Sequence, residues 1–131
     1  MNRQQIGKKA EQLTCIYLQQ QGLQLQAQNF YSRYGEIDLI MCHGDTLCFI
    51  EVRARHTSAY GGAVDTVNQR KQYKIIQTAQ VYLQTYPVYE DLSARFDVVA
   101  LDYDDTQIWQ KNFQQQLQQI TIDWIQDAYT L

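Results

Sequence analysis

The chain has 131 residues, a net charge of −3 and 45% hydrophobic residues, which are values typical of one globular domain. We therefore expect residues 1–131 to form a single domain. No stretch is apolar enough to span a membrane, and the N-terminal region lacks the apolar run of a signal peptide. Together with three cysteines, an odd number that suits a reducing compartment, this predicts a cytoplasmic protein.

The charges are distributed unevenly along the chain. Residues 1–74 hold nine Lys and Arg against six acids, whereas residues 75–131 hold two against eight. A basic half beside an acidic half agrees with a phosphate-binding face in the first half. An evenly solvated surface explains the same counts nearly as well.

Helical spacing of apolar residues predicts the first element, a helix over residues 3–21 that ends at a glycine C-cap, Gly22. Its inward stripe would be Ile6, Ala10, Leu13 and Tyr17. Residues 24–34 then read as an extended stretch that leads into a hairpin.

Residues 35–42 and 46–54 predict the two strands of that β-hairpin, because β-branched and aromatic residues alternate with polar ones. Gly44-Asp45 suits a two-residue turn. This turn sets a register in which His43 faces Thr46 and Ile40 faces Phe49, and in which Cys42 and Cys48 fall on opposite faces. One face then carries Glu36, Asp38, Glu51 and Arg53.

In this register Asp38 lies opposite Glu51, and Glu36 lies opposite Arg53. Like charges directly opposite one another destabilise a sheet, so the first pair is unfavourable unless a cation lies between the two side chains. Hard oxygen ligands at this spacing suit Mg²⁺ or Mn²⁺. The competing interpretation is a solvated strand face with an ion pair between Glu36 and Arg53, and a one-residue bulge would change the register.

A second helix is predicted from a cap at Asp65 or Thr66 to about Tyr86. Residues 95–101 read as a strand, followed by a turn at residues 104–105. The buried stripe of the helix would be Ile75, Ile76, Ala79, Tyr82 and Leu83.

The C-terminal quarter is less clear. Residues 107–119 are rich in Gln and fit a helix or a strand, with Trp109, Phe113 and Leu117 as the inward residues. Residues 122–129 predict a short terminal helix. The whole order of elements predicts an α/β sandwich around a mixed sheet.

Several motifs resemble known proteins. The segment 35–40 with Asp38, followed by Glu51-Val52-Arg53, is similar to the acid and the E-x-K of the PD-(D/E)XK nuclease superfamily. Nearly the whole chain resembles the YraN family (UPF0102), small bacterial proteins described as related to Holliday-junction resolvases. The other matching segments are residues 7–11, Asn29, Gly61-Gly62, residues 67–71, residues 95–99 and residues 124–129.

This resemblance implies an α/β restriction-endonuclease-like sandwich, with a central mixed β-sheet flanked by helices. It implies a Mg²⁺- or Mn²⁺-dependent endonuclease acting on DNA, including branched or damaged DNA. Asp38 and Glu51 would be the metal ligands, with the Val52 carbonyl as a third and Glu11 as the acid that resolvase-like members add. By analogy with resolvases, the chain would form a homodimer.

Arg53 departs from the superfamily pattern, which usually has Lys at this position. Arginine does not deprotonate in proteins and cannot act as a base, although it can clamp a phosphate with two hydrogen bonds. Lys71 could supply the missing ammonium, or it could be a solvated helix lysine. The predicted catalytic set is Asp38, Glu51, Arg53 and Lys71, and the predicted nucleic-acid-binding set is Arg33, Arg55, Arg70 and Lys74.

Other polar residues near these motifs have structural interpretations. Glu36 is expected to orient Arg53 through an ion pair, and Asp97 to pair with Arg95 or a helix end. Tyr34 and Tyr60 flank the proposed site and could stack on an unpaired base, although burial is the favoured role for each.

Three functions remain open on the sequence. The first is the metal-dependent nuclease, and the second is a non-catalytic nucleic-acid-binding module, which Arg53 and the acidic pI favour. The third is a protein-interaction module that uses the Gln-rich C-terminal half. The three acids Glu11, Asp38 and Glu51 favour the nuclease, because carboxylates that face a phosphate backbone only repel it when no metal is present.

Overall fold

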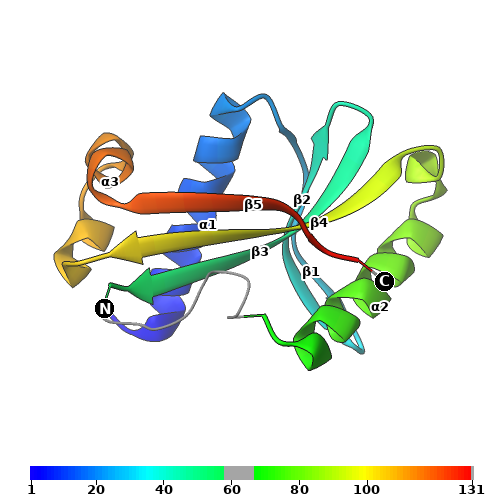
Figure 1. Cartoon of the computed structure of the whole chain (residues 1–131), viewed down its shortest axis with the longest axis horizontal. Coiled ribbons are helices and arrows are strands. Elements are labelled where there is room, and N and C mark those ends of the chain that lie inside the picture. The colour runs from blue at the N-terminus through cyan, green and yellow to red at the C-terminus, as the bar shows by residue number, and fades with distance from the viewer. Residues whose placement is uncertain (58–66, 131) are drawn as a thin grey trace.

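A computed structural model describes residues 1–57 and 67–130. Its centre is a five-stranded mixed sheet with the strand order β1-β2-β3-β4-β5. Helices α1 and α3 cover one face of the sheet, and α2 covers the other (Figure 1). The predicted α/β sandwich with a central mixed sheet is confirmed.

The sheet is built from three antiparallel strand pairs and one parallel pair that is joined by a crossover. Strands β3 and β4 are parallel and are connected through α2, whereas all other neighbouring strands are antiparallel. The elements are α1 Arg3–Gln20, β1 Gln24–Ser32, β2 Gly35–His43, β3 Thr46–His56, α2 Gln69–Thr85, η2 Pro87–Tyr89, β4 Ser93–Tyr103, η3 Thr106–Gln110, α3 Phe113–Gln119 and β5 Thr121–Tyr129.

Local capping accounts for the bounds of α1. The Asn2 side chain accepts a hydrogen bond from the Gln5 N–H, and the Gln5 side chain accepts one from the Asn2 N–H, both at 2.9 Å. At the other end Gly22 adopts the left-handed φ of 95° that the predicted C-cap requires. Ala10 and Leu13 are fully buried, so the predicted helix and its inward stripe are confirmed.

The turn of the β2–β3 hairpin also agrees with the prediction. His43 lies opposite Thr46 and Ile40 opposite Phe49, and Gly44 has a φ of 60°. Cys42 packs on the α2 side and Cys48 on the α1 side, which confirms that they lie on opposite faces.

The predicted pairing of β2 with β3 does not extend to Asp38 and Glu51. The β2–β3 pairing ends where Leu39 lies opposite Ile50, so Asp38 and Glu51 lie just beyond the paired region. Ile37 packs under α2 whereas Leu39 packs under α1, so the alternation of side chains is broken at Asp38. The four charged residues predicted for one face therefore do not share it.

Helix α2 begins later than predicted. Its N-cap is Asn68, whose Oδ1 accepts a hydrogen bond from the Lys71 N–H at 2.9 Å. The predicted caps Asp65 and Thr66 lie outside the described residues. The inward stripe is confirmed, with Leu83 half-buried and the other four residues buried.

The C-terminal segment holds the clearest error. Residues 122–129 form a strand, β5, and not a helix, with Trp124 opposite Val99 and Ile125 opposite Val98. A short apolar segment fits both periods, and here β4 needs a partner for its outer edge. The Gln-rich segment is helical in η3 and α3, where Trp109 is fully buried, but Phe113 is 41% exposed and does not face inward.

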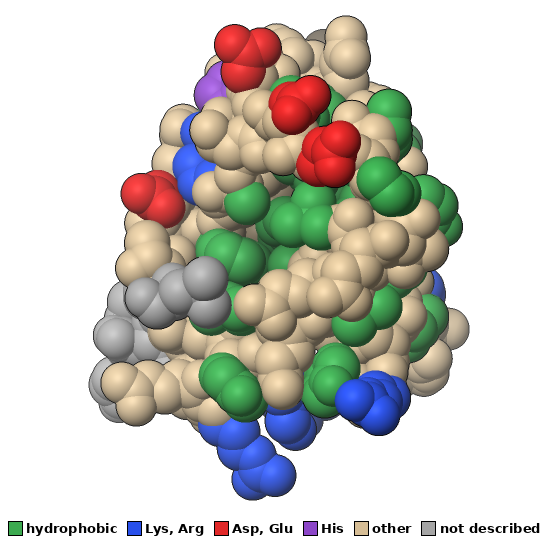
Figure 2. Space-filling view, turned by 90° about the vertical axis from the view of Figure 1, so that its right-hand side faces the viewer, with side chains coloured by type: hydrophobic (Ala, Val, Ile, Leu, Met, Phe, Trp, Pro, Cys, Tyr) green, Lys and Arg blue, Asp and Glu red, His purple; other side chains and the backbone are tan. Residues whose placement is uncertain are grey.

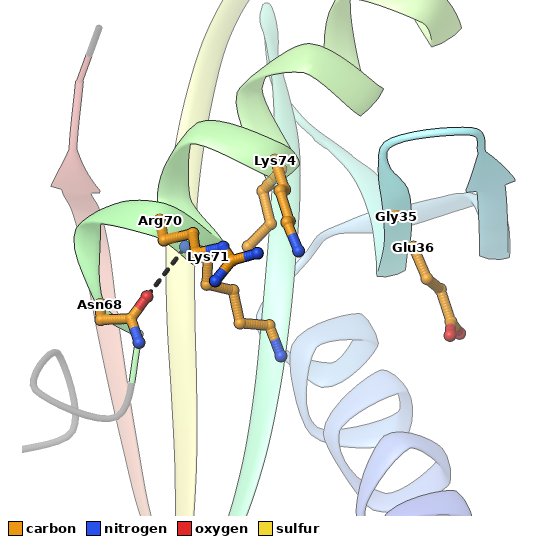
Figure 3. A pocket seen from close by; sticks show the side chains of 7 residues that line it. Gly35, Glu36, Asn68, Arg70, Lys71 and Lys74 are labelled. Carbon is orange, nitrogen blue, oxygen red and sulfur yellow. Dashed lines mark hydrogen bonds between the residues drawn. The ribbon is translucent and has the colours of Figure 1, made fainter.

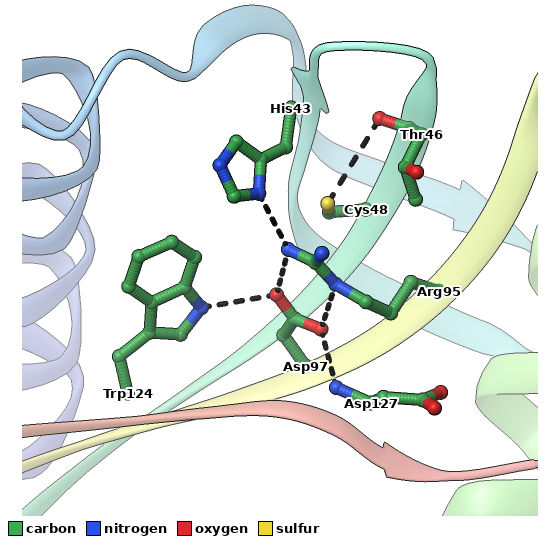
Figure 4. Close-up of polar contacts among 7 residues, drawn as sticks. All are labelled: His43, Thr46, Cys48, Arg95, Asp97, Trp124 and Asp127. Carbon is green, nitrogen blue, oxygen red and sulfur yellow. Dashed lines mark hydrogen bonds and ion pairs between the residues drawn. The ribbon is translucent and has the colours of Figure 1, made fainter.

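A buried polar network joins β5 to β4 (Figure 4). The Asp97 side chain is fully buried and accepts hydrogen bonds from Arg95 Nε at 2.9 Å and Arg95 Nη2 at 3.1 Å. It also accepts from Trp124 Nε1 and from the Asp127 N–H, both at 3.0 Å. Arg95 Nη2 lies 3.0 Å from His43 Nδ1. The predicted structural pairing of Asp97 with Arg95 is confirmed.

Within residues 1–57 and 67–130, every helix is too short or too polar to cross a lipid bilayer.

Candidate active site

The two motif acids lie where β2 and β3 stop pairing, in the region between α1 and α2. Asp38 is half-buried, and its Oδ2 accepts a hydrogen bond from the Val52 N–H at 2.8 Å. Glu51 is only 5% exposed, and its Oε1 lies 3.1 Å from Lys71 Nζ and 3.4 Å from Arg53 Nη2. The structure thus brings together all four residues of the predicted catalytic set.

The two acids have different charge environments. The pKa of Asp38 is raised from 3.8 to about 8, first by burial and then by the negative charge of Glu51, while the Val52 N–H acts in the opposite direction. Glu51 has two cationic partners, but Asp38 has none among the described residues. An added cation next to Asp38 would favour its ionised form.

Two further carboxylates lie at the same site. Asn29 Nδ2 donates hydrogen bonds to Glu11 Oε1 at 3.0 Å and to Glu36 Oε1 at 2.6 Å. Burial raises the pKa of Glu11, and the charge of Glu36 adds to this shift. The predicted ion pair between Glu36 and Arg53 is wrong, because Glu36 turns toward α1 and Arg53 pairs with Glu51.

The side chains as placed offer a partial metal site. Among the residues that the structure describes, no group of three or more His, Cys, Asp or Glu side chains is arranged to hold an ion. Asp38 and Glu51 provide two hard oxygen ligands, which is enough for Mg²⁺ because this ion usually keeps several waters. The raised pKa of Asp38, which comes from burial and then from the charge of Glu51, fits a position where a bound cation would stabilise the carboxylate.

A cleft of about 490 Å³ opens beside the acids, between the start of β2 and the first turns of α2. The nitrogen ends of Arg70, Lys71 and Lys74 point into the space between α2 and Glu36 (Figure 3). Within the described ranges, neither Arg70 nor Lys74 has a carboxylate within 4.0 Å. The full lining is Gly35, Glu36, Asn68, Arg70, Lys71, Lys74 and Ile75.

The other predicted nucleic-acid contacts are not at this cleft. Arg55 binds Asp102 through Nε at 2.9 Å and Nη2 at 3.1 Å. Arg33 lies over the ring of the half-buried Tyr34, 4.8 Å from its centroid, at the β1–β2 turn. Tyr60 lies outside the described residues.

Charge is separated on the face of the molecule shown in Figure 2. Most of the visible Lys and Arg side chains lie at its lower end and most of the Asp and Glu side chains near its upper end, with hydrophobic side chains between them, while some blue atoms also lie at the upper left beside the His. The basic first turns of α2 and the exposed Glu90 and Asp91 that follow its C-terminal end agree with this separation.

The sequence did not identify Asn29 and Asn68 as site residues. The sequence nevertheless contains a recognisable pattern around each of these two residues. An asparagine inside an expected strand indicates special backbone geometry, because Asn is depleted in strands and tolerates a positive φ. An asparagine just before a helical pattern is a typical N-cap.

Comparison with known proteins places the chain in a family. The model of the uncharacterised protein family UPF0102 matches residues 10–101, a span that contains both Asp38 and Glu51. A UPF0102 protein of Acinetobacter baumannii (strain AYE) is 43% identical over 130 residues, which cover 98% of this chain and 96% of that protein. A UPF0102 protein of Pseudomonas syringae pv. tomato is 47% identical over 100 residues, which cover 76% of this chain and 78% of that protein. This chain therefore belongs to the uncharacterised protein family UPF0102.

Proposed function

We propose that this protein is a divalent-cation-dependent nuclease that hydrolyses phosphodiester bonds in DNA. The observation that carries the proposal is the pair of Asp38 and Glu51, held in a region where burial, and then the charge of Glu51, raises the pKa of Asp38 to about 8. Such a pair is unfavourable in a purely structural role. It lies beside a cleft lined by the cations Arg70, Lys71 and Lys74, which suit a phosphate backbone.

Mg²⁺ or Mn²⁺ is the cofactor that this donor set suits. Asp38 and Glu51 would hold it, with the Val52 carbonyl as a third ligand and Glu11 as an added acid. When bound, such an ion supplies positive charge for the scissile phosphate and lowers the pKa of a water molecule.

Arg53 and Lys71 would bind the phosphate. The Arg53 side chain is 28% exposed, and its Nε has no hydrogen-bond partner among the described residues, so its guanidinium has donating capacity that Glu51 does not use. Lys71 contacts Glu51 and also lines the cleft, so its ammonium can reach a phosphate there. Neither residue needs to act as the base, a role that arginine cannot perform.

The second candidate function is a non-catalytic module that binds nucleic acid. It is favoured by the two cations already placed on Glu51 and by the lack of a three-ligand cluster among the described residues. In that case the cleft would bind DNA, and the acids would only shape its wall.

The decisive experiment compares the wild type with Asp38→Asn and Glu51→Gln, prepared identically. Each protein is incubated with supercoiled plasmid, a four-way junction and single-stranded DNA, in Mg²⁺, Mn²⁺ or EDTA. Glu90→Gln, which removes an exposed acid beyond the far end of α2, is the matched control. Sedimentation in parallel measures whether the active species is a homodimer.

We expect cleavage by the wild type and by Glu90→Gln only, and its loss in EDTA. Equal cleavage by all four proteins would indicate a contaminating nuclease. Salt-dependent binding without cleavage in any protein would support the second candidate function. No affinity for any polynucleotide would reject both candidates and favour a protein-interaction module.

A further inference from the structure

We infer that Asn29 is a positioning residue that holds the carboxylates of Glu11 and Glu36 side by side next to Asp38. This inference rests on the proposed cation-dependent function and deepens it, because it assigns a role to a residue outside the motif acids and their cationic partners.

The geometry of the Asn29 amide is specific. A single nitrogen, Nδ2, donates to a carboxylate from α1 at 3.0 Å and to a carboxylate from β2 at 2.6 Å. The amide oxygen, Oδ1, lies 3.4 Å from Lys8 Nζ. Asn29 therefore connects three elements, α1, β1 and β2, at the level of the site.

The backbone around Asn29 explains how the amide reaches both acids. Gln28 lies opposite Leu39 and Phe30 lies opposite Ile37, so Asn29 is level with Asp38 on the neighbouring strand. Asn29 has a φ of 50°, a left-handed conformation inside a strand. Such a conformation is unfavourable for most residues and tends to persist only where the surrounding structure requires it.

Asn29 organises these acids without neutralising them. An uncharged amide can satisfy one oxygen of each carboxylate and leaves their full negative charge available to a cation. Lys71 acts differently on Glu51, because its ammonium cancels charge. Positioning of ligands by hydrogen bonds from outside the metal's own ligand set is a common feature of metal sites.

The open space beside Glu11 gives the bridge a further role. A second cavity, of about 230 Å³, lies on the α1 side of the bridge and is lined in part by Lys8, Glu11 and Asn29. Glu11 therefore has open space into which it can rotate, and mutual repulsion would drive it away from Glu36 if the amide were absent.

The test is Mn²⁺ binding to the metal-free protein, measured by calorimetry for the wild type and for Asn29→Gly. Glycine keeps the positive φ and removes only the amide. We expect Mn²⁺ affinity to fall about 10-fold or more, the usual effect of losing a residue that orients metal ligands. Gln28→Gly, the same change at the exposed neighbouring position, is the matched control and should bind as the wild type does.

Two additions keep the test decisive. Asn29→Ser, which is too short to bridge the acids, replaces Asn29→Gly if the glycine variant does not fold. In a Glu11→Gln, Glu36→Gln background, removing the Asn29 amide should not weaken Mn²⁺ binding further.

The outcomes separate this inference from the proposed function. Wild-type binding that is lost in Asp38→Asn but unchanged in Asn29→Gly overturns the inference and leaves the proposed function standing. Absence of any Mn²⁺ binding by the wild type overturns the proposed function, and the positioning role falls with it. Weaker binding in Asn29→Gly, but not in Gln28→Gly, supports both.

Discussion

Asp38 is the residue at which stability and activity are expected to conflict. Its environment is unfavourable for a charge because of burial and the neighbouring Glu51, and no cation among the described residues offsets this. A carboxyl whose pKa is raised in the folded state keeps its proton longer than in the unfolded chain. Folding stability therefore falls as pH rises from about 4 to about 8.

We predict that Asp38→Asn stabilises the metal-free protein, with a gain that is near zero at pH 4 and greatest above pH 8. The gain at pH 8 should be about 2–4 kcal/mol, since each unit of pKa shift corresponds to ~1.4 kcal/mol before solvent relaxation. Urea unfolding at several pH values measures it. A gain that does not depend on pH would show that Asp38 is not the titrating group.

Lys71 forms an ion pair with Glu51, whose side chain is almost fully buried. We predict that Lys71→Met lowers the free energy of unfolding by about 1–3 kcal/mol, because a buried carboxylate loses its closest cation. DNA cleavage should be lost as well. Lys74→Met, one helical turn further on, should weaken DNA binding with little effect on stability. Equal stability losses in the two variants would contradict the assigned contact.

At the scale of elements, β5 depends on contacts that are distant in the sequence. Asp97 of β4 accepts hydrogen bonds from Trp124 and from the Asp127 N–H, and Asp127 has a φ of 53°. The register between β4 and β5 shifts between Phe96 and Val98 of β4, and this irregularity accommodates the geometry. The attachment of β5 thus relies on one buried carboxylate.

We predict that Asp97→Asn destabilises the protein by about 3–5 kcal/mol, because Arg95 would lose its charged partner in a buried environment. Trp124 fluorescence should report a changed environment before global unfolding. Asp91→Asn, at an exposed position, is the control and should have the stability of the wild type. An unchanged unfolding midpoint in Asp97→Asn would show that the network contributes little.

At the scale of the whole molecule, the negative net charge conceals a strong separation of charge. The cleft presents Arg70, Lys71 and Lys74 although the chain carries −3 overall. We predict DNA binding that weakens steeply with salt, with the slope of log affinity against log salt falling by about 1 in Arg70→Gln. Fluorescence anisotropy measures this slope. Lys111→Gln, in the acidic half of the sequence, should leave the slope unchanged.

The fold was largely predictable because α1, α2 and the β2–β3 hairpin have clear periodicity and clear punctuation, such as Gly22 and Gly44. The strand over residues 122–129 was not predictable, because eight residues fit a helix and a strand equally. The unpaired edge of β4 decides between the two. The motif acids were identified from their spacing. The turn of Glu36 toward Asn29 depends on a left-handed residue and a break in alternation at Asp38, which only the assembled sheet reveals.

The attachment of β5 has a consequence for biosynthesis. During translation Asp97 emerges before Trp124 and Asp127, so it first meets only Arg95. Until β5 is made, half of the four hydrogen bonds that Asp97 accepts are missing, and burying its carboxylate is unfavourable. A nascent chain stalled before β5 should therefore keep β4 loosely docked and sensitive to proteases. Emergence of β5 from the ribosome, more than any earlier step, would then commit the sheet to its final packing.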